Sequence, residues 1–142
     1  MTENEIGTVL IEEAIQLHRE LGPGLLESVY EVVLADSLKK RGLAVRRQVQ
    51  VPIRFRGILF DEGFCADLVI GEKVLAELKS VEAVIPAHKK QVQTYLRLTG
   101  LKLGYLLNFG EAVIKNGITR CVNGLEENPQ RPCAPAGKID FP

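Results

Sequence analysis

The sequence has few of the residues that build disulfide frameworks, zinc sites and membrane spans. Its three cysteines are an odd number and widely spaced, which argues against a disulfide framework. No CxxC or HxxxH spacing indicates zinc. No apolar run approaches the roughly 18 residues of a membrane helix, and the opening MTENEIG lacks the basic and apolar regions of a signal peptide. We therefore expect a reduced, cytoplasmic protein with no membrane partner.

Net charge is also absent, since 18 basic side chains balance 18 acidic ones. The molecule as a whole therefore has no general attraction for a polyanion. No GxxxxGKS/T, GxGxxG or GxSxG pattern occurs, so nucleotide hydrolysis, dinucleotide binding and serine-hydrolase chemistry lack support. Locally, the stretch from Lys39 to Phe60 holds several basic residues and no acid, which permits a phosphate-facing surface. For Lys39–Arg41 the alternative is that they only complement a helix C-terminus.

Periodicity predicts one domain over residues 1–125, followed by a tail at 126–142 whose Pro and Gly content predicts poor packing. The expected helices are Asn4–Leu21, Leu26–Arg41 and Pro86–Leu98. The expected strands are Ala44–Phe55, Ile58–Phe60, Phe64–Ile70, Val74–Lys79, Leu103–Asn108, Ala112–Ile114 and Ile118–Val122. Pro52 indicates an edge strand or a bulge, and Asp61–Gly63 and Gly71-Glu72 are expected turns. This order of elements predicts an α/β sandwich with a mixed sheet.

Two carboxylates and a lysine stand out in the stretch ADLVIGEKVLAELKS. Nine residues separate Asp67 from Glu77, and Lys79 follows two positions later. Side chains alternate along a strand, so Glu77 and Lys79 project to one side, roughly 6–7 Å apart at the backbone. If Gly71-Glu72 is a hairpin turn, Asp67 lies across from the Glu77 region. An acid pair beside a lysine can hold a hard divalent cation and position water for attack on phosphate. The alternative is the solvated rim of a sheet.

The third expected helix carries further polar residues. Gln91 and Tyr95 are four positions apart and therefore share a helix face. His88, Lys89 and Lys90 crowd the N-terminal half of the helix, where a phosphate can bind. The alternative is a solvated, slightly basic helix in which Tyr95 is partly buried.

The second expected helix opens with GLLESVY, in which Glu27 and Tyr30 are neighbours on one face. Two plain alternatives stand beside a functional role. Glu27 in the first turn can simply favour the positive end of the helix dipole, and Tyr30 can simply be part of the core.

Taken together, the segments LGPGLLESVY, FCADLVI, AELKS, QVQTY and YLLNFG resemble the small bacterial and archaeal GxxExxY proteins, which are grouped with the PD-(D/E)XK nuclease superfamily. The resemblance runs from about Ile6 to Gly124. It implies a restriction-endonuclease-like αβββαβ core, in which helices flank a central mixed sheet. It also implies a site for one or two Mg²⁺ or Mn²⁺ ions.

The resemblance implies roles for individual residues. Asp67 and Glu77 match the metal-binding acids, and the Leu78 backbone carbonyl is a further expected ligand. Glu27 matches the acid of the helical motif and would complete the metal shell directly or through water. Lys79 matches the motif lysine, which would orient the attacking water or stabilise the transition state.

Gln91 and Tyr95 match the QxxxY of the exonuclease-like branch and would hold the site or the nucleic-acid backbone. One segment departs from the pattern: Phe64-Cys65-Ala66 precedes the acid where many relatives are expected to carry a basic residue, so one substrate contact is not carried over. The other expected substrate contacts are Tyr30, His88, Lys89, Lys90, Arg54 and Arg56.

These residues predict a Mg²⁺- or Mn²⁺-dependent nuclease that hydrolyses phosphodiester bonds, in DNA rather than RNA, by metal-activated water. The first alternative is a non-catalytic nucleic-acid-binding or protein-interaction module that retains the nuclease fold. The second is an unrelated α/β protein with rim charges, which predicts that Glu27, Asp67 and Glu77 lie far apart. The expected setting is a prokaryotic cytoplasm, and a homodimer would help so small a chain reach more of a duplex.

Overall fold

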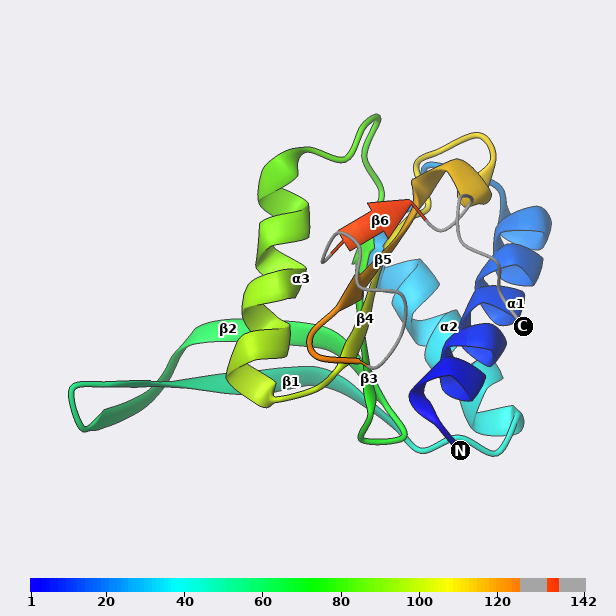
Figure 1. Ribbon diagram of the computed structural model, residues 1–142. Coiled ribbons are helices and arrows are strands. Elements are labelled where there is room, and N and C mark those ends of the chain that lie inside the picture. The colour runs from blue at the N-terminus through cyan, green and yellow to red at the C-terminus, as the bar shows by residue number, and fades with distance from the viewer. Residues whose placement is uncertain (126–132, 136–142) are drawn as a thin grey trace.

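The protein is an α/β sandwich built on one mixed sheet. In this computed structural model, which describes residues 1–125 and 133–135, six strands lie in the order β1-β2-β3-β4-β5-β6. The helices are α1 (Glu3–Leu21), α2 (Glu27–Lys40), α3 (Pro86–Thr99) and the short 3-10 helix η1 (Ile114–Gly117). The strands are β1 (Val45–Phe55), β2 (Ile58–Ile70), β3 (Val74–Lys79), β4 (Leu103–Asn108), β5 (Ile118–Val122) and β6 (Cys133–Pro135). Neighbouring strands are antiparallel except for β3 and β4, which are parallel (Figure 1).

The helix ends follow local signals in the sequence. The Thr2 side chain caps the first turn of α1, and Gly22 ends that helix with a φ of 78°. α3 begins at Pro86 and ends at Gly100, which adopts a left-handed φ of 75°. The three predicted helices are therefore confirmed, with ends that differ by one residue at most from those expected.

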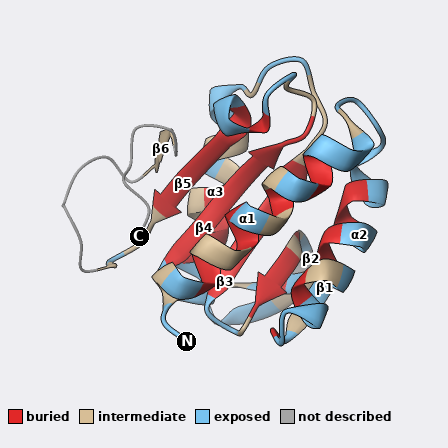
Figure 2. Ribbon diagram, turned by 90° about the vertical axis from the view of Figure 1, so that its right-hand side faces the viewer, coloured by how far each residue is buried: buried red, intermediate tan, exposed pale blue. Residues whose placement is uncertain are grey.

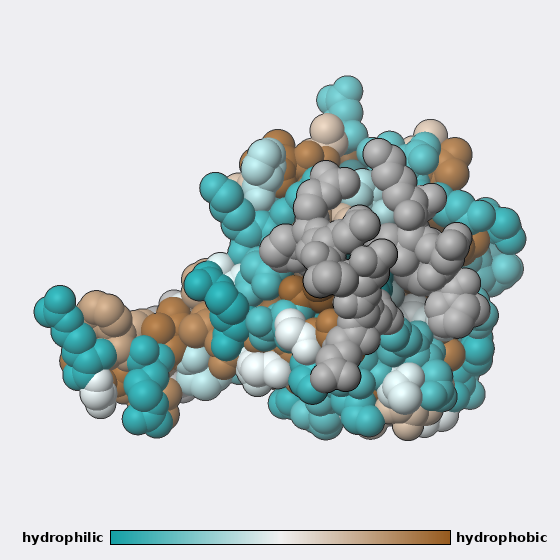
Figure 3. All heavy atoms as spheres, viewed as in Figure 1, coloured by the Kyte–Doolittle hydropathy of each residue, from teal (hydrophilic) through white to brown (hydrophobic). Residues whose placement is uncertain are grey.

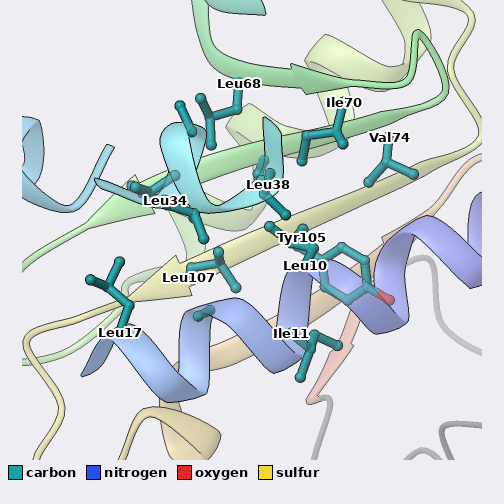
Figure 4. Close-up of a cluster of buried hydrophobic side chains, with 14 of the residues drawn as sticks. Leu10, Ile11, Leu17, Leu34, Leu38, Leu68, Ile70, Val74, Tyr105 and Leu107 are labelled. Carbon is teal, nitrogen blue, oxygen red and sulfur yellow. The ribbon is translucent and has the colours of Figure 1, made fainter. Parts of the chain in front are cut away.

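Helices cover both faces of the sheet. α1 and α2 enclose the larger core against one face, and Figure 2 shows the buried residues along the central strands and the inner sides of these helices. Figure 4 shows side chains of this core, which include Leu10, Leu17, Leu34, Leu38, Leu68, Ile70, Tyr105 and Leu107. α3 packs on the other face with a smaller cluster, which includes Val51, Leu75, Val92, Tyr95, Leu96 and Leu106. The succession α2-β1-β2-β3-α3-β4 confirms the expected αβββαβ core.

The hairpin of β1 and β2 extends beyond the body of the protein as an arm (Figure 1). Its end exposes Phe55, Ile58 and Leu59. The sequence predicted two strands with a turn at Asp61–Gly63, and this is wrong, because β2 runs unbroken from Ile58 to Ile70. The register with β1 shifts between Val51 and Ile53 instead, so the extra residues of β2 form a bulge opposite Pro52. The predicted edge position and irregularity at Pro52 are confirmed.

The segment between β4 and β5 also differs from the prediction. A strand was expected at Ala112–Ile114, but the chain bends there and continues into η1. The Asn116 N–H donates to the Val113 carbonyl at 3.1 Å, which closes a tight turn of the 3-10 type. Such a turn leaves no extended segment for strand pairing.

A disulfide joins Cys121 of β5 to Cys133 of β6. The expectation drawn from the odd, widely spaced cysteines is therefore wrong for this pair. The two residues stand directly opposite each other in the antiparallel register, although twelve positions separate them in the chain. Of the tail expected at 126–142, Cys133–Pro135 pair as a strand, and residues 126–132 and 136–142 lie outside the described residues.

Candidate active site

Two carboxylates meet where β2 and β3 stop pairing. The backbone pairing of these strands runs from Ile70–Val74 to Leu68–Ala76. At the next position, Glu77 Oε1 accepts the Asp67 backbone N–H at 2.9 Å. Asp67 Oδ2 accepts the Leu78 backbone N–H at 2.8 Å. The carboxylates thus bond backbone groups at the point of separation, which holds the two acids side by side.

Glu77 is an acid in an unfavourable environment for its charge. Its side chain is almost fully enclosed, with 3% exposed. Burial raises the pKa of Glu77 to about 8, and the charge of Asp67 adds to the rise. The hydrogen bond from the Asp67 backbone and the charge of Lys79 lower the pKa only in part. A cation bound beside this carboxylate would stabilise its charged form.

Lys79 lies two positions beyond Glu77 at the end of β3 and is partly buried. Its charge lowers the pKa of Glu77, and it also lowers that of His88 on α3. The ammonium group is therefore electrostatically coupled both to the buried acid and to the first turn of α3. This is the position that the sequence predicted for a cation beside the acid pair.

Gln91 and Tyr95 form the α3 side of the site. The Gln91 side-chain amide donates to the Tyr95 hydroxyl at 2.9 Å, and this hydroxyl donates to the Cys65 carbonyl at 3.4 Å. Burial raises the pKa of Tyr95 to about 12, and the charge of Glu77 contributes to the rise. The predicted shared face is confirmed, and it lies against the strand that carries Asp67.

Glu27 lies at the first residue of α2 and is exposed. Burial and the charge of Lys79 lower the pKa of His88, whereas the charge of Glu27 opposes them. Glu27, His88 and Lys79 are therefore electrostatic neighbours. Among the side chains that the structure describes, which exclude those at positions 61 and 62, no three from His, Cys, Asp or Glu gather closely enough to hold a metal ion by themselves. The sequence predicted that Glu27 completes the metal shell of Asp67 and Glu77 directly or through water; of these two arrangements, the direct one is not seen among the described side chains.

Tyr30 has a structural position, which corrects the expectation that it contacts substrate. The side chain is fully buried and stacks on Phe109 with ring centroids 4.3 Å apart. Its hydroxyl donates to the Gly22 carbonyl at 2.6 Å and accepts the Leu25 N–H at 3.0 Å. Tyr30 therefore fixes the loop that leads into α2 and offers no surface to a ligand.

The remaining expected substrate contacts lie in two places. Lys89 and Lys90 follow His88 in the first turns of α3. Arg54 and Arg56 lie on the arm, which Figure 3 shows projecting from the body with both apolar and polar side chains on its surface. Arg54 pairs with Leu59, eight positions before Asp67 in β2. The bulge adds residues to β2 without adding length, so the distance is better counted on β1, where Arg54 and Arg56 lie six and eight positions beyond the residue opposite Asp67. At about 3.3 Å per residue this places the arginines roughly 20–26 Å from the acid pair.

Comparison with known proteins assigns the family. The sequence model of the PD-(D/E)XK nuclease superfamily matches residues 4–121. This chain belongs to the PD-(D/E)XK nuclease superfamily. No curated protein and no solved structure matches the chain. Superfamily membership supports a nuclease-type function that involves nucleic acid, and enzymes of the superfamily generally use divalent metal ions. No helix among the described residues is long and apolar enough to cross a membrane.

The acid pair fits the metal chemistry of the PD-(D/E)XK superfamily. Mg²⁺ is usually held by one or two carboxylates, with waters and substrate phosphates completing an octahedral shell. Asp67 and Glu77 supply two carboxylates held side by side. The raised pKa of Glu77 reflects a burial cost and a repulsion that a divalent cation would relieve. A third acidic side chain is not required for such a shell.

Two residues beside the acids were missed from the sequence. Glu31 is a buried acid one turn after Glu27 on α2, and it accepts a hydrogen bond from the Gln48 side chain. The same Gln48 amide donates to Asp67 Oδ1 at 3.2 Å. The spacing of four between Glu27 and Glu31 was a usable signal for a shared helix face. Gln48 carries no such signal, because its position depends on a left-handed backbone in the middle of β1.

Proposed function

We propose that the protein is a divalent-metal-dependent nuclease that hydrolyses phosphodiester bonds in DNA. The observation that carries this proposal is the meeting of Asp67 and Glu77 where β2 and β3 separate, with Lys79 beside them. The superfamily match supports the reaction class. Metal dependence and DNA as the substrate are inferred from the acid pair and from the basic residues around it.

In this proposal the acid pair holds Mg²⁺ or Mn²⁺, with the Leu78 carbonyl as a further ligand. When bound, the ion would lower the pKa of a coordinated water and offset charge on the scissile phosphate. Asp67 and Glu77 each accept a backbone N–H, which restrains the two carboxylates. Glu27 is exposed at the start of α2 and would complete the shell through water.

Lys79 would act on the reacting groups as a fixed cation. Its charge acts on both Glu77 and His88, so it is close enough to influence the acid pair and the first turn of α3. From there it would orient the attacking water or stabilise negative charge that develops on the phosphate. Gln91 and Tyr95 would hold the α3 side of the site through their hydrogen bond and the bond to Cys65.

DNA would extend from the acid pair across the first turns of α3, where His88, Lys89 and Lys90 would contact its backbone. The arm would reach a more distant part of the duplex through Arg54 and Arg56. A separation of roughly 20–26 Å along β1 corresponds to about six to eight base pairs at 3.4 Å each. The arm would therefore position the duplex without entering the reaction.

We also propose that the chain belongs to the GxxExxY branch of the superfamily and acts in a prokaryotic cytoplasm, with a homodimer reaching more of the duplex. The motif GLLESVY supports this branch, and Tyr30 has a structural reason to be tyrosine, since its hydroxyl makes two hydrogen bonds in the loop before α2.

A cleavage assay tests the proposed function. Purified protein is incubated with single- and double-stranded DNA and RNA in Mg²⁺, Mn²⁺ or EDTA. We expect metal-dependent cleavage of DNA that falls at least 10²-fold in Lys79→Ala, because one preorganised charge contact to a transition state is worth about that factor. As a control, the variant is purified in parallel, and circular dichroism is used to check that it is folded. Equal cleavage by Lys79→Ala would indicate a contaminating nuclease and refute the assignment.

One observation favours a second candidate, a nucleic-acid-binding module without catalysis. The acid pair already bonds backbone N–H groups, and Glu27 does not join it as a direct ligand. This candidate has no need of a metal. Calorimetric titration of the wild-type protein with Mn²⁺ therefore separates the two: binding that is lost in Glu77→Ala supports the nuclease, and DNA binding without any Mn²⁺ uptake supports the module.

A further inference from the structure

A single glutamine connects helix α2 to the acid pair. The Gln48 amide nitrogen donates to the Glu31 carboxylate and to Asp67 Oδ1, the latter at 3.2 Å. The Gln48 amide oxygen accepts the Cys65 thiol at 3.2 Å. One side-chain amide therefore touches three polar groups that come from α2 and β2.

Glu31 provides a fixed anchor for this amide. Its carboxylate is buried on the inner side of α2. Arg47 donates to Glu31 Oε2 through two nitrogens, at 2.9 and 3.0 Å, while Gln48 donates to Oε1. A buried carboxylate held by an arginine and an amide has little freedom to turn. The amide of Gln48 is in turn held in one place.

The backbone at Gln48 departs from regular strand geometry. In a regular strand, Arg47 and Gln48 would project to opposite faces, so both could not contact Glu31. Gln48 instead has a φ of 50°, a left-handed conformation that costs free energy for any residue with a β-carbon. The bend brings both side chains to the same carboxylate. It occurs opposite Asp67, between the pairs Arg47–Leu68 and Val49–Ala66.

We propose that Gln48 is a positioning residue for the Asp67 carboxylate, with Glu31 and Arg47 holding Gln48 in place. Asp67 Oδ2 is fixed by the Leu78 N–H and Oδ1 by the Gln48 amide, so the two bonds together set the rotation of the carboxylate. Removing a partner that orients a metal-binding side chain typically lowers metal affinity or activity by about 10–100-fold. This role rests on the proposed function, because the orientation of Asp67 matters to the chemistry only if Asp67 binds the metal.

Gln48→Gly separates the amide from the backbone. Glycine adopts a φ of 50° without a steric penalty, so the bend of β1 is retained while the amide is lost. We expect the Kd for Mn²⁺, measured by calorimetry, to rise about 10–100-fold, and kcat for DNA cleavage to fall by a similar factor. The KM for DNA should change little, since Gln48 contacts no substrate in the proposed arrangement. Binding is measured at a temperature at which circular dichroism shows each variant fully folded.

Glu72→Gly is the matched control. Glu72 also has a left-handed backbone, with a φ of 57°, but it lies in the turn between β2 and β3 and its carboxylate pairs with Arg46. It should bind Mn²⁺ and cleave DNA as the wild type does. If Gln48→Gly also matches the wild type in both assays, the positioning role is overturned. If the wild type itself neither binds Mn²⁺ nor cleaves DNA, the proposed function fails and takes this role with it.

Discussion

Replacing Glu77 by glutamine should make the protein more stable and inactive at once. Glu77 has a folded-state pKa of about 8 against an ordinary value of 4.5, chiefly because it is buried and secondly because Asp67 lies beside it. Between these values the folded chain holds a proton that the unfolded chain releases, so stability falls as the pH rises through this window. The loss of stability caused by ionising the buried Glu77 is absent below pH 4.5 and complete above pH 8.

The size of the effect follows from the shift. From 4.5 to about 8, at 1.36 kcal/mol per pKa unit, the penalty amounts to roughly 5 kcal/mol at high pH. About 4 kcal/mol of this develops between pH 5 and pH 9. Glu77→Gln removes the titrating charge, and the amide oxygen can still accept the Asp67 N–H that Glu77 Oε1 accepts in the wild type. The free energy of unfolding of the variant should therefore rise, relative to that of the wild type, by up to about 4 kcal/mol between pH 5 and pH 9.

Urea unfolding at several pH values from 5 to 9, in EDTA, measures this difference. The comparison of variant with wild type cancels the titration of groups that do not interact with Glu77. Glu82→Gln makes the same chemical change at an exposed position and corrects for the general loss of one carboxylate. The stability difference between Glu77→Gln and the wild type should change over this range. If it stays constant within about 1 kcal/mol, Glu77 is not a buried acid with a raised pKa. Cleavage by the variant should be absent in either Mg²⁺ or Mn²⁺.

The arm and the loop before α2 allow two further tests. Arg54→Ala and Arg56→Ala should weaken DNA binding to a similar extent for all sequences, and each should reduce the slope of log K against log salt by about 1. A binding titration at several salt concentrations measures this slope. An unchanged slope would show that the arm does not contact DNA. Tyr30→Phe should lower the free energy of unfolding by about 1–2 kcal/mol, because the Gly22 carbonyl and the Leu25 N–H lose their partner. Urea unfolding checks the second expectation, and a loss of DNA affinity without loss of stability would contradict the structural role of Tyr30.

Much of the fold could be predicted because its signals are local. Pro86 and the glycines at positions 22 and 100 mark helix ends through their own backbone preferences. Alternation and the turn at Gly71-Glu72 placed β2 against β3, which brings Asp67 close to Glu77. These inferences need only a few neighbouring residues.

The errors occurred where pairing overrides local preference. Asp61–Gly63 has a typical turn composition. However, the residues of β2 on both sides of this segment pair with β1, and this pairing keeps β2 extended. Cys121 and Cys133 are distant in the chain, and only the register of β5 with β6 places their sulfur atoms together. Composition and spacing contain no information on either of these pairings.

The sequence by itself determined the order of the three long helices and the main strands, the faces of the helices, and the acids and lysine of the candidate site, because periodicity and short motifs depend on residues close together in the chain. The tertiary structure alone decided which oxygen meets which donor. Gln48 joins Glu31 and Asp67 across 17 and 19 positions of the chain, and it does so through a single left-handed φ. A contact of that kind depends on the packing of α2 against the strands, which no local pattern encodes.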